Sequence, residues 1–171
     1  EEVLSNGQHL TVVDMMNLQM DELSVAARNL VPLLRNLGGV EGVAEQARAM
    51  LLDWDFVVGK DSVEAAIYVS WERRLRDNVR DAIVPAEARD YIGNVNTKRM
   101  LDWLVAPDGR FGTDPIMGRD AILRDSLTEA LMNLNERFGT PDMTTWQYGS
   151  EKFKHALIMH PMSGAVTAEL R

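Results

Sequence analysis

The sequence predicts a mainly α-helical domain with a short β element near its C-terminal end. Three observations predict this fold class. Apolar residues recur at spacings of three and four along several segments, capping residues precede those segments, and Gly or Pro residues follow them. The 171 residues fit one domain spanning the whole chain, 1–171. Long helices joined by short connections favour bundle-like packing.

The first helical segment is expected to run from Thr11 to Leu37. Asp14 stands three residues after Thr11, as in a capping box. Pro32 must kink this helix or restart it, because proline lacks an N–H group and clashes with the preceding turn. Two glycines at 38 and 39 are expected to end it. The apolar stripe that predicts the segment consists of Val12, Met16, Met20, Leu23, Ala27, Leu30, Leu34 and Leu37.

The next two segments have clear limits. A second helix is expected from about Val40 to Leu52, and the sequence Asp53–Asp55 ends it. Asp61 is predicted to cap the third helix, with Glu64 at its third helical position. Pro85 lies beyond the end of that helix. Its buried face is predicted from a spacing of four along Val63, Ile67, Trp71, Leu75 and Val79.

A fourth, shorter helix is predicted over Thr97–Val105, followed by a loop over Ala106–Pro115 that is rich in Gly and Pro. The fifth helix is predicted over Arg119–Phe138, with Gly139 just after its end. Asp142–Trp146 is expected to form one further turn. The core face of the fifth helix is predicted to hold Ile122, Leu123, Leu127, Ala130, Leu131 and Leu134.

The tail Phe153–Met159 is short and apolar, and Gly149 and Pro161 bound it. This segment is the expected β element. A lone strand leaves its edge unpaired and needs a partner, so the strand would pair with another part of a larger protein.

Composition excludes several classes of function. The formal net charge of −8 argues against nucleic-acid binding, which needs clustered Lys and Arg, and argues more weakly against anionic membranes. The absence of cysteine excludes disulfides and thiolate chemistry. No stretch reaches the roughly 18 apolar residues of a membrane span. The chain starts at Glu1 without a signal peptide, and we expect it to be a processed or excised segment.

The sequence shows no pattern typical of an active site. The three histidines, His9, His155 and His160, are scattered, and none belongs to an HExxH pair. The nucleophile elbow GxSxG, the phosphate loop GxxxxGK and the dinucleotide fingerprint GxGxxG are all missing. The carboxylate pair Asp53 and Asp55 would need environments that separate the two pKa values to act as acid and base. We favour the interpretation that this pair flanks a helix end and fixes the turn around Trp54.

Aromatic, methionine and arginine residues each allow a functional and a structural interpretation. The four tryptophans suggest a stacking platform, but tryptophan more often supplies large core contacts. Met15, Met16 and Met20 fall on or beside the first apolar stripe, where methionine fills gaps in a core. We therefore predict core positions for both sets. The run Arg73–Arg76 is interpreted as a solvated helix face or an interdomain contact rather than a phosphate site.

Four short stretches, taken in order, carry a family resemblance. They are Thr11–Asp21 with Ala26–Leu34, Leu51–Asp55 with Ser62–Tyr68 and Trp71, Phe138 and Gly139 with Trp146–Gly149, and His160–Ser163. Their order and spacing resemble the later part of the β subunit of the penicillin acylase (penicillin amidase) family of N-terminal-nucleophile hydrolases. Each stretch is short, and their collinearity along nearly the whole chain carries the assignment. The family often has glycine after the Trp-Asp pair, where this chain has Phe56, and histidine a few residues after W-x-x-G, where it has Phe153 and then His155.

The resemblance implies a specific chemistry in a larger parent protein. Such enzymes are made as one precursor that cuts itself into α and β subunits. The new N-terminal serine attacks the carbonyl of a linear amide, with its own α-amine as base. Backbone and asparagine donors form the oxyanion hole. The acyl groups cleaved within the family include those of penicillins, cephalosporins, N-acyl-homoserine lactones and cyclic lipopeptides.

In the family these catalytic groups lie upstream of the region that this chain resembles. We therefore assign no catalytic, cofactor-binding or metal-ligating residue to the chain, and expect it to be inactive alone. His160 with Pro161 is interpreted as a structural turn. The resemblance also implies packing on an αββα core, partners in the remaining β subunit and the α subunit, no cofactor apart from a structural calcium elsewhere in the parent, and a periplasmic or secreted location. The alternative is a non-enzymatic helical interaction module.

Overall fold

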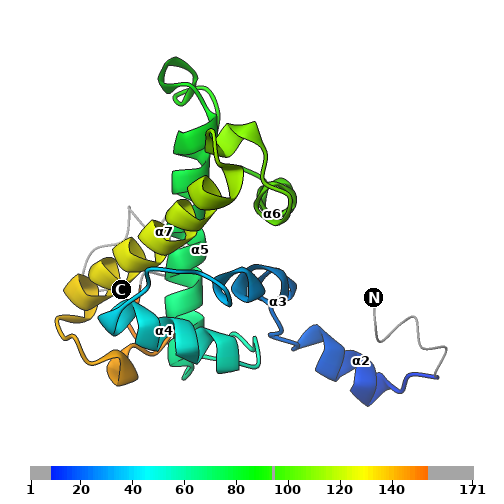
Figure 1. Ribbon diagram of the computed structural model, residues 1–171. Helices are drawn as coiled ribbons and strands as arrows, with labels where there is room; N and C mark the ends of the chain where they lie inside the picture. Colours follow the sequence, from blue (N-terminus) through cyan, green and yellow to red (C-terminus); the bar gives the residue numbers. More distant parts are fainter. Residues whose placement is uncertain (1–8, 94, 154–171) are drawn as a thin grey trace, which may run out of the picture.

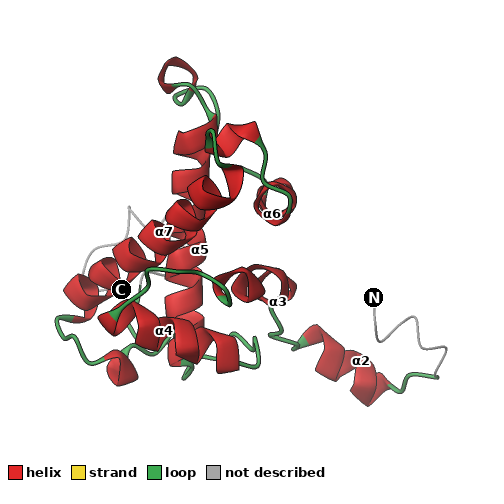
Figure 2. Ribbon diagram, viewed as in Figure 1, coloured by secondary structure: helices red, strands yellow, loops and turns green. Residues whose placement is uncertain are grey.

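The computed structural model describes residues 9–93 and 95–153. Within them the chain forms six α-helices and four 3₁₀ turns (Figures 1 and 2). The mainly α prediction is therefore confirmed. The α-helices are α2 (Val12–Gln19), α3 (Val25–Leu30), α4 (Gly42–Asp53), α5 (Val63–Ile83), α6 (Thr97–Val105) and α7 (Pro115–Phe138), and the 3₁₀ turns are η1 (Val31–Leu34), η2 (Ala86–Ala88), η3 (Gly109–Phe111) and η4 (Met143–Thr145).

The only β pairing that the structure describes is an isolated antiparallel bridge between Leu23 and Val57. The predicted strand Phe153–Met159 lies outside the described residues except for Phe153, which is buried in a bend. Within the described part of the chain, no helix is long and apolar enough to cross a membrane.

Helices α5 and α7 form the centre of the fold and pack against each other. The spacing of four on α5 buries Ile67, Trp71, Leu75 and Val79 completely, as predicted, while Val63 is half-buried. The indole Nε1 of Trp71 donates to the carbonyl of Leu123 on α7 at 3.3 Å, which satisfies a polar group inside the core. The predicted face of α7 is also buried, at Leu123, Leu127, Ala130, Leu131 and Leu134, while Ile122 is half-buried.

The shorter helices complete one continuous core around this pair. Helix α4 contributes Ala47 and Leu51, α6 contributes Met100 and Leu104, and α3 with η1 contributes Ala27, Leu30, Val31 and Leu34. Figure 1 shows α6 beside the upper part of α5 and α4 near its lower end. The limits predicted for the fourth helix are confirmed by α6, whereas α4 begins at Gly42 and ends at Asp53, two residues and one residue after the limits predicted for the second helix.

The first predicted helix is wrong as a continuous element. The chain leaves the helical conformation after Gln19 and re-enters it at Val25. Between them, the N–H of Ser24 donates to the carbonyl of Phe56 at 2.9 Å, and the N–H of Val58 donates to the carbonyl of Glu22 at 3.0 Å. These tertiary hydrogen bonds replace the intrahelical ones. Further along, the chain continues from α3 as the tight turn η1, which begins at Val31 with Pro32 in its first turn, as proline at an N-terminal helical position permits.

The core prediction for Met15, Met16 and Met20 is also wrong. All three side chains are exposed, because α2 projects away from the other helices (Figure 1). The capping box at the start of α2 is confirmed. The N–H of Asp14 donates to Thr11 Oγ1 at 3.2 Å, and the N–H of Thr11 donates to Asp14 Oδ2 at 2.8 Å. Hydrogen bonds from the Thr11 side chain and backbone lower the pKa of the Asp14 carboxyl.

Two helix starts differ from the predictions. Ser62, not Asp61, caps α5, and its Oγ accepts from the N–H of Ala65 at 3.0 Å. Helix α7 begins at Pro115 rather than Arg119, because the Asp114 side chain caps it and proline fits the first turn. The end of α7 is as predicted. Gly139 adopts the left-handed conformation there, with a φ of 70°. The turn predicted over Asp142–Trp146 is present as η4.

Candidate functional site

The Trp-Asp pair forms a structural turn at the end of α4. Trp54 is buried, and its Nε1 donates to the carbonyl of Val57 at 3.2 Å. The carboxylate of Asp55 accepts from the N–H of Val57 at 2.9 Å, and Asp53 is the last residue of α4. The interpretation that these aspartates flank a helix end and fix the turn around Trp54 is confirmed. The turn places Phe56 at a φ of 67°, in the left-handed region.

The Trp54 ring belongs to a row of aromatic side chains that leads into the core. Its centroid lies 5.5 Å from that of Tyr68, and Tyr68 meets Trp71 edge-on at 6.3 Å. Burial, followed by the nearby Glu72 carboxylate, raises the pKa of Tyr68. The core prediction is confirmed for Trp54, Trp71 and Trp146, and Trp103 is half-buried beneath the guanidinium of Arg110.

The W-x-x-G stretch packs against the start of α5. Trp146 is buried, and its Nε1 donates to the carbonyl of Thr140 at 3.0 Å. The N–H of Tyr148 donates to the carbonyl of Ser62 at 3.0 Å, and that of Gly149 donates to the carbonyl of Lys60. A Cβ at position 149 would lie 2.8 Å from the carbonyl oxygen of Lys60 and 2.7 Å from its Cβ. Glycine is needed here because the two backbones come so close.

Two of the four stretches that carry the family resemblance meet around the N-terminal end of α5, the second through Trp54 on Tyr68 and the third through the bonds to Lys60 and Ser62. The segment between the two parts of the first stretch lies beside the residues that follow Trp54, because Leu23 is bridged to Val57. The fourth stretch, His160–Ser163, lies outside the described residues, as does His155. The described histidine, His9, is exposed.

Within the run Arg73–Arg76, Arg73 and Arg74 are exposed, which agrees with the interpretation as a solvated helix face, and the arginines also make contacts within the fold. The Nε of Arg74 lies 3.2 Å from the carboxylate of Glu129 on α7. Arg76 pairs with Glu72 and donates to the Thr97 hydroxyl at the start of α6 at 3.0 Å. The guanidinium of Arg73 lies 5.6 Å from the ring centroid of Phe153, a cation–π contact. These arginines tie α5 to its neighbours.

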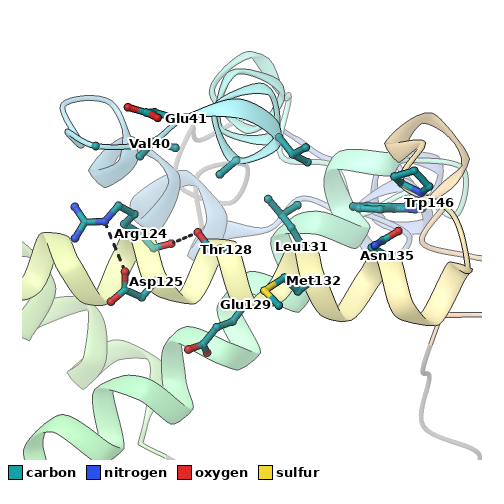
Figure 3. Close-up of a pocket in the computed structure, with 14 residues that line it drawn as sticks. Val40, Glu41, Arg124, Asp125, Thr128, Glu129, Leu131, Met132, Asn135 and Trp146 are labelled. Atoms are coloured by element: carbon teal, nitrogen blue, oxygen red, sulfur yellow. Dashed lines mark hydrogen bonds and ion pairs between the residues drawn. The ribbon is translucent and has the colours of Figure 1, made fainter.

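A groove of about 700 Å³ runs between the start of α4 and one side of α7 (Figure 3). Figure 3 shows Leu131 pointing from α7 toward α4, with Trp146 at one end and Arg124 near the other, on the side of Val40. Arg124 donates to the carbonyl of Gly38 at 3.2 Å and lies 3.6 Å from the carboxylate of Asp125. The apolar lining is formed by Val40, Val43, Ala44, Leu131, Met132, Pro141 and Trp146.

The chemistry of this groove favours noncovalent contact over catalysis. A nucleophilic hydroxyl must be hydrogen-bonded to a base that removes its proton. The hydroxyl of Thr128 instead donates to the carbonyl of Arg124 at 3.1 Å, and the carboxylate of Glu129 pairs with Arg74. Across residues 9–93 and 95–153, no three His, Asp or Glu side chains are grouped so as to hold a metal ion.

The sequence did not predict the groove, because its walls come from segments about 80 residues apart that the fold brings together. The one signal was the apolar Val40, Val43 and Ala44 directly after the two glycines at 38 and 39. Periodicity identified the buried face of α7 but gave no sign that the neighbouring Met132 and Asn135 line a cavity.

Comparison with known proteins agrees with the resemblance carried by the four stretches. The family model described as penicillin amidase matches residues 1–170. No curated protein matches the chain. The family match covers the whole helical core, including the Trp-Asp turn and the W-x-x-G stretch that meet at α5. The chain therefore belongs to the penicillin amidase family.

Proposed function

We propose that this chain is the helical segment of an amidohydrolase that cleaves linear amides, with acyl groups of the penicillin, cephalosporin or N-acyl-homoserine-lactone type. The match to the penicillin amidase family over residues 1–170 carries the proposal. Membership implies a hydrolase as the parent protein. The particular amide bond and the acyl group are the proposed part.

The segment acts as a scaffold in this proposal. Two of the family's stretches join α4, α5 and the segment after α7 here, through backbone hydrogen bonds and buried tryptophans. The nucleophile is an N-terminal serine in another part of the parent β subunit, activated by its own α-amine. The helices of this chain pack on the αββα core that holds this serine and form part of the wall of its cleft.

The proposal extends to partners and location. The partners are the remaining β subunit and the α subunit, and neither nucleic acid nor a membrane is one. The chemistry uses no cofactor, since the serine and its amine supply nucleophile and base. The parent acts in the periplasm or outside the cell and has a role in antibiotic metabolism.

The test compares two proteins expressed from the same gene, the complete coding region and residues 1–171 alone. Both are incubated with penicillin G and with a long-chain N-acyl-homoserine lactone, and the released amine is quantified. We expect the complete product to mature into two subunits and release amine, and the isolated segment to release none.

Release of 6-aminopenicillanic acid or homoserine lactone by the isolated segment would overturn the scaffold role. A complete product that matures but hydrolyses no linear amide would overturn the amidohydrolase assignment and favour the helical interaction module. N-terminal sequencing of the matured subunit locates the serine directly, and its replacement by alanine should abolish both maturation and hydrolysis.

A further inference from the structure

The connection between α5 and α6 is the most open part of the helical core. It follows Ile83 and ends before Thr97. Figure 1 shows it projecting beyond the end of α5, at the top of the view. From residue 85 to residue 93, no side chain is buried, and Tyr91 is 89% exposed. Exposed loop tips of this kind are preferred sites of proteolytic cleavage.

The hydrogen bonds of this connection remain local. Residues 85–93 are all described, and none of their backbone hydrogen bonds reaches another element of the fold. The N–H of Tyr91, for example, donates to the carbonyl of Ala88 at 3.1 Å. The Arg89 side chain donates to the carbonyls of Asp81 at 2.7 Å and Val84 at 3.1 Å, at the end of α5. The tip can therefore open without breaking contacts elsewhere, which keeps the free-energy cost of local opening low.

The other connections of the core are each held by a buried side chain. In the described part of the chain these anchors are Leu37 before α4, Trp54 before α5, Phe111 before α7 and Trp146 after α7. An endopeptidase cuts the open form of a segment, so cleavage follows the population of that form. Opening these four connections would pull an apolar side chain out of the core, whereas opening the one that carries Tyr91 would not.

The two sides of this connection are held together by contacts that do not pass through it. Val79 near the end of α5 is completely buried, as are Met100 and Leu104 on α6. Arg76 on α5 donates to the Thr97 hydroxyl on α6 at 3.0 Å. All three buried residues belong to the one hydrophobic core. A break in the connection would therefore leave α5 and α6 in place.

The side chains of the tip indicate which endopeptidase fits. The guanidinium of Arg89 is bound to two carbonyls of α5, so a protease pocket that selects a basic residue would have to break both bonds. The exposed ring of Tyr91 needs no such rearrangement. Ile92 and Gly93 follow it, and neither is proline, so the next peptide bond has an ordinary N–H. A pocket that selects a large aromatic residue is therefore favoured.

We infer that the peptide bond between Tyr91 and Ile92 is a proteolytic processing site for an endopeptidase that selects a large aromatic residue. Hydrolysis breaks the C–N bond and adds one water molecule, leaving a carboxylate on Tyr91 and an amino group on Ile92. The products, residues 1–91 and 92–171, stay associated as one folded unit. This inference concerns the fold of the chain and does not depend on the proposed amidohydrolase function.

Limited digestion tests the site. Dilute chymotrypsin is added to the folded chain, and intact masses are followed over time. We expect the first cut after residue 24 to follow Tyr91, while earlier cuts only shorten the N-terminal side and are scored separately. Phe111 and Tyr148 are internal controls, since both are aromatic but lie in anchored connections. Cleavage after either should be slower by at least about 10-fold. Faster cleavage at Phe111 or Tyr148 than at Tyr91 would overturn the inference.

Matched variants identify the bond. Tyr91→Ser removes the aromatic side chain, and Asp90→Ser changes the residue beside it and leaves the ring in place. Neither should change the Tm, since both side chains are exposed. Tyr91→Ser should slow the cut in residues 85–93 by at least about 10-fold, because a protease pocket discriminates by the side chain that fills it. Asp90→Ser should leave the rate unchanged. If the two variants are cut alike, the assigned bond is wrong.

The association of the products is measured on the cut chain. We expect the two fragments to elute together from a sizing column in native buffer, with the helical circular dichroism of the intact chain, and to separate only in denaturant. Fragments that separate in native buffer, or that lose the helical signal on cutting, would contradict the inference, because the connection would then be needed to hold α5 and α6 together.

Discussion

At the scale of single residues, Phe56 adopts a φ of 67°, a conformation that costs an L-residue about 1–2 kcal/mol. The turn accepts this cost because it places Phe56 edge-on against Trp54, with centroids 5.6 Å apart, and aims its carbonyl at Ser24. The related family often has glycine at this position, which adopts the same φ without strain. Phenylalanine at this position therefore adds an aromatic contact with Trp54 at the cost of backbone strain that glycine would not have.

Because of this backbone strain, we predict that glycine is favoured over alanine at position 56, the reverse of their order within a helix. Phe56→Ala and Phe56→Gly both remove the ring, but only the alanine retains a Cβ in the left-handed region. We expect the glycine variant to be more stable than the alanine variant by about 1 kcal/mol in urea unfolding. The same pair at Met132, an exposed position within α7, should show the opposite order, by about 1 kcal/mol. Equal signs at the two positions would contradict the left-handed conformation of Phe56.

Gly118 shows a second constraint that acts at one residue. A Cβ built there would lie 1.8 Å from the carbonyl oxygen of Phe111, because η3 rests directly on the first turns of α7. The neighbour is backbone and cannot rotate away. Gly109, in η3 itself, has open space around the corresponding position and serves as a matched control.

We predict that Gly118→Ala lowers the free energy of unfolding by about 3 kcal/mol, through overpacking. Gly109→Ala should change it by less than about 0.5 kcal/mol. Chemical denaturation of the two variants measures both values. Similar stabilities would show that η3 does not rest on α7 in solution.

At the scale of elements, the start of α5 shows how neighbouring segments select a helix boundary. Asp61 and Ser62 are both suitable capping residues, and local chemistry alone does not choose between them. The carbonyl of Ser62 accepts from Tyr148 and that of Lys60 accepts from Gly149, and Ser62, which follows the turn at Lys60 and Asp61, is extended. Ser62 is thereby placed where its hydroxyl reaches the N–H of Ala65.

Because Ser62 and not Asp61 caps α5, replacing each of these side chains by alanine should change the free energy of unfolding by different amounts. Ser62→Ala should lower the free energy of unfolding by about 1 kcal/mol, as loss of a capping hydroxyl does. Asp61→Ala, an exposed side chain outside the cap, should change it by less than about 0.5 kcal/mol. Thermal unfolding of both variants decides the matter, and a larger loss at Asp61 would place the cap there instead.

At the scale of the whole molecule, α5 contacts α4, α6, α7 and the 3₁₀ turns η3 and η4. Its buried face packs on α7, its first turn receives the W-x-x-G stretch, and its arginines reach α6 and α7. Three tryptophans from different parts of the chain, Trp54, Trp71 and Trp146, belong to the same buried cluster. A core shared in this way should fold and unfold as one unit.

We therefore predict a single cooperative unfolding transition for residues 1–171. Far-UV circular dichroism, which follows the helices, and tryptophan fluorescence, which follows the core, should give the same denaturant midpoint. Distinct midpoints would divide the chain into two units and contradict the single-domain prediction. Helix α2 is expected to exchange its amides separately, since it lies outside the cluster.

The sequence alone determined the features that depend on neighbours along the chain. Periodicity identified α4, α6, the buried face of α5 and the end of α7 at Gly139, because spacing and left-handed glycine are local properties. Four collinear stretches were enough to identify the penicillin amidase family, which the family match over residues 1–170 confirms.

Tertiary structure decided what covers each face and where hydrogen bonds go. Spacing places Val12, Met16 and Met20 on one stripe with Ala27 and Leu30, but it cannot report that Ser24 pairs with Phe56 and turns the first part away from the core. The groove beside α7 and the contacts of Arg73–Arg76 also depend on which elements the fold brings together, so spacing along the chain does not reveal them. A periodic pattern states which side chains share a face, and only another element of the fold, or of a partner, decides whether that face is buried.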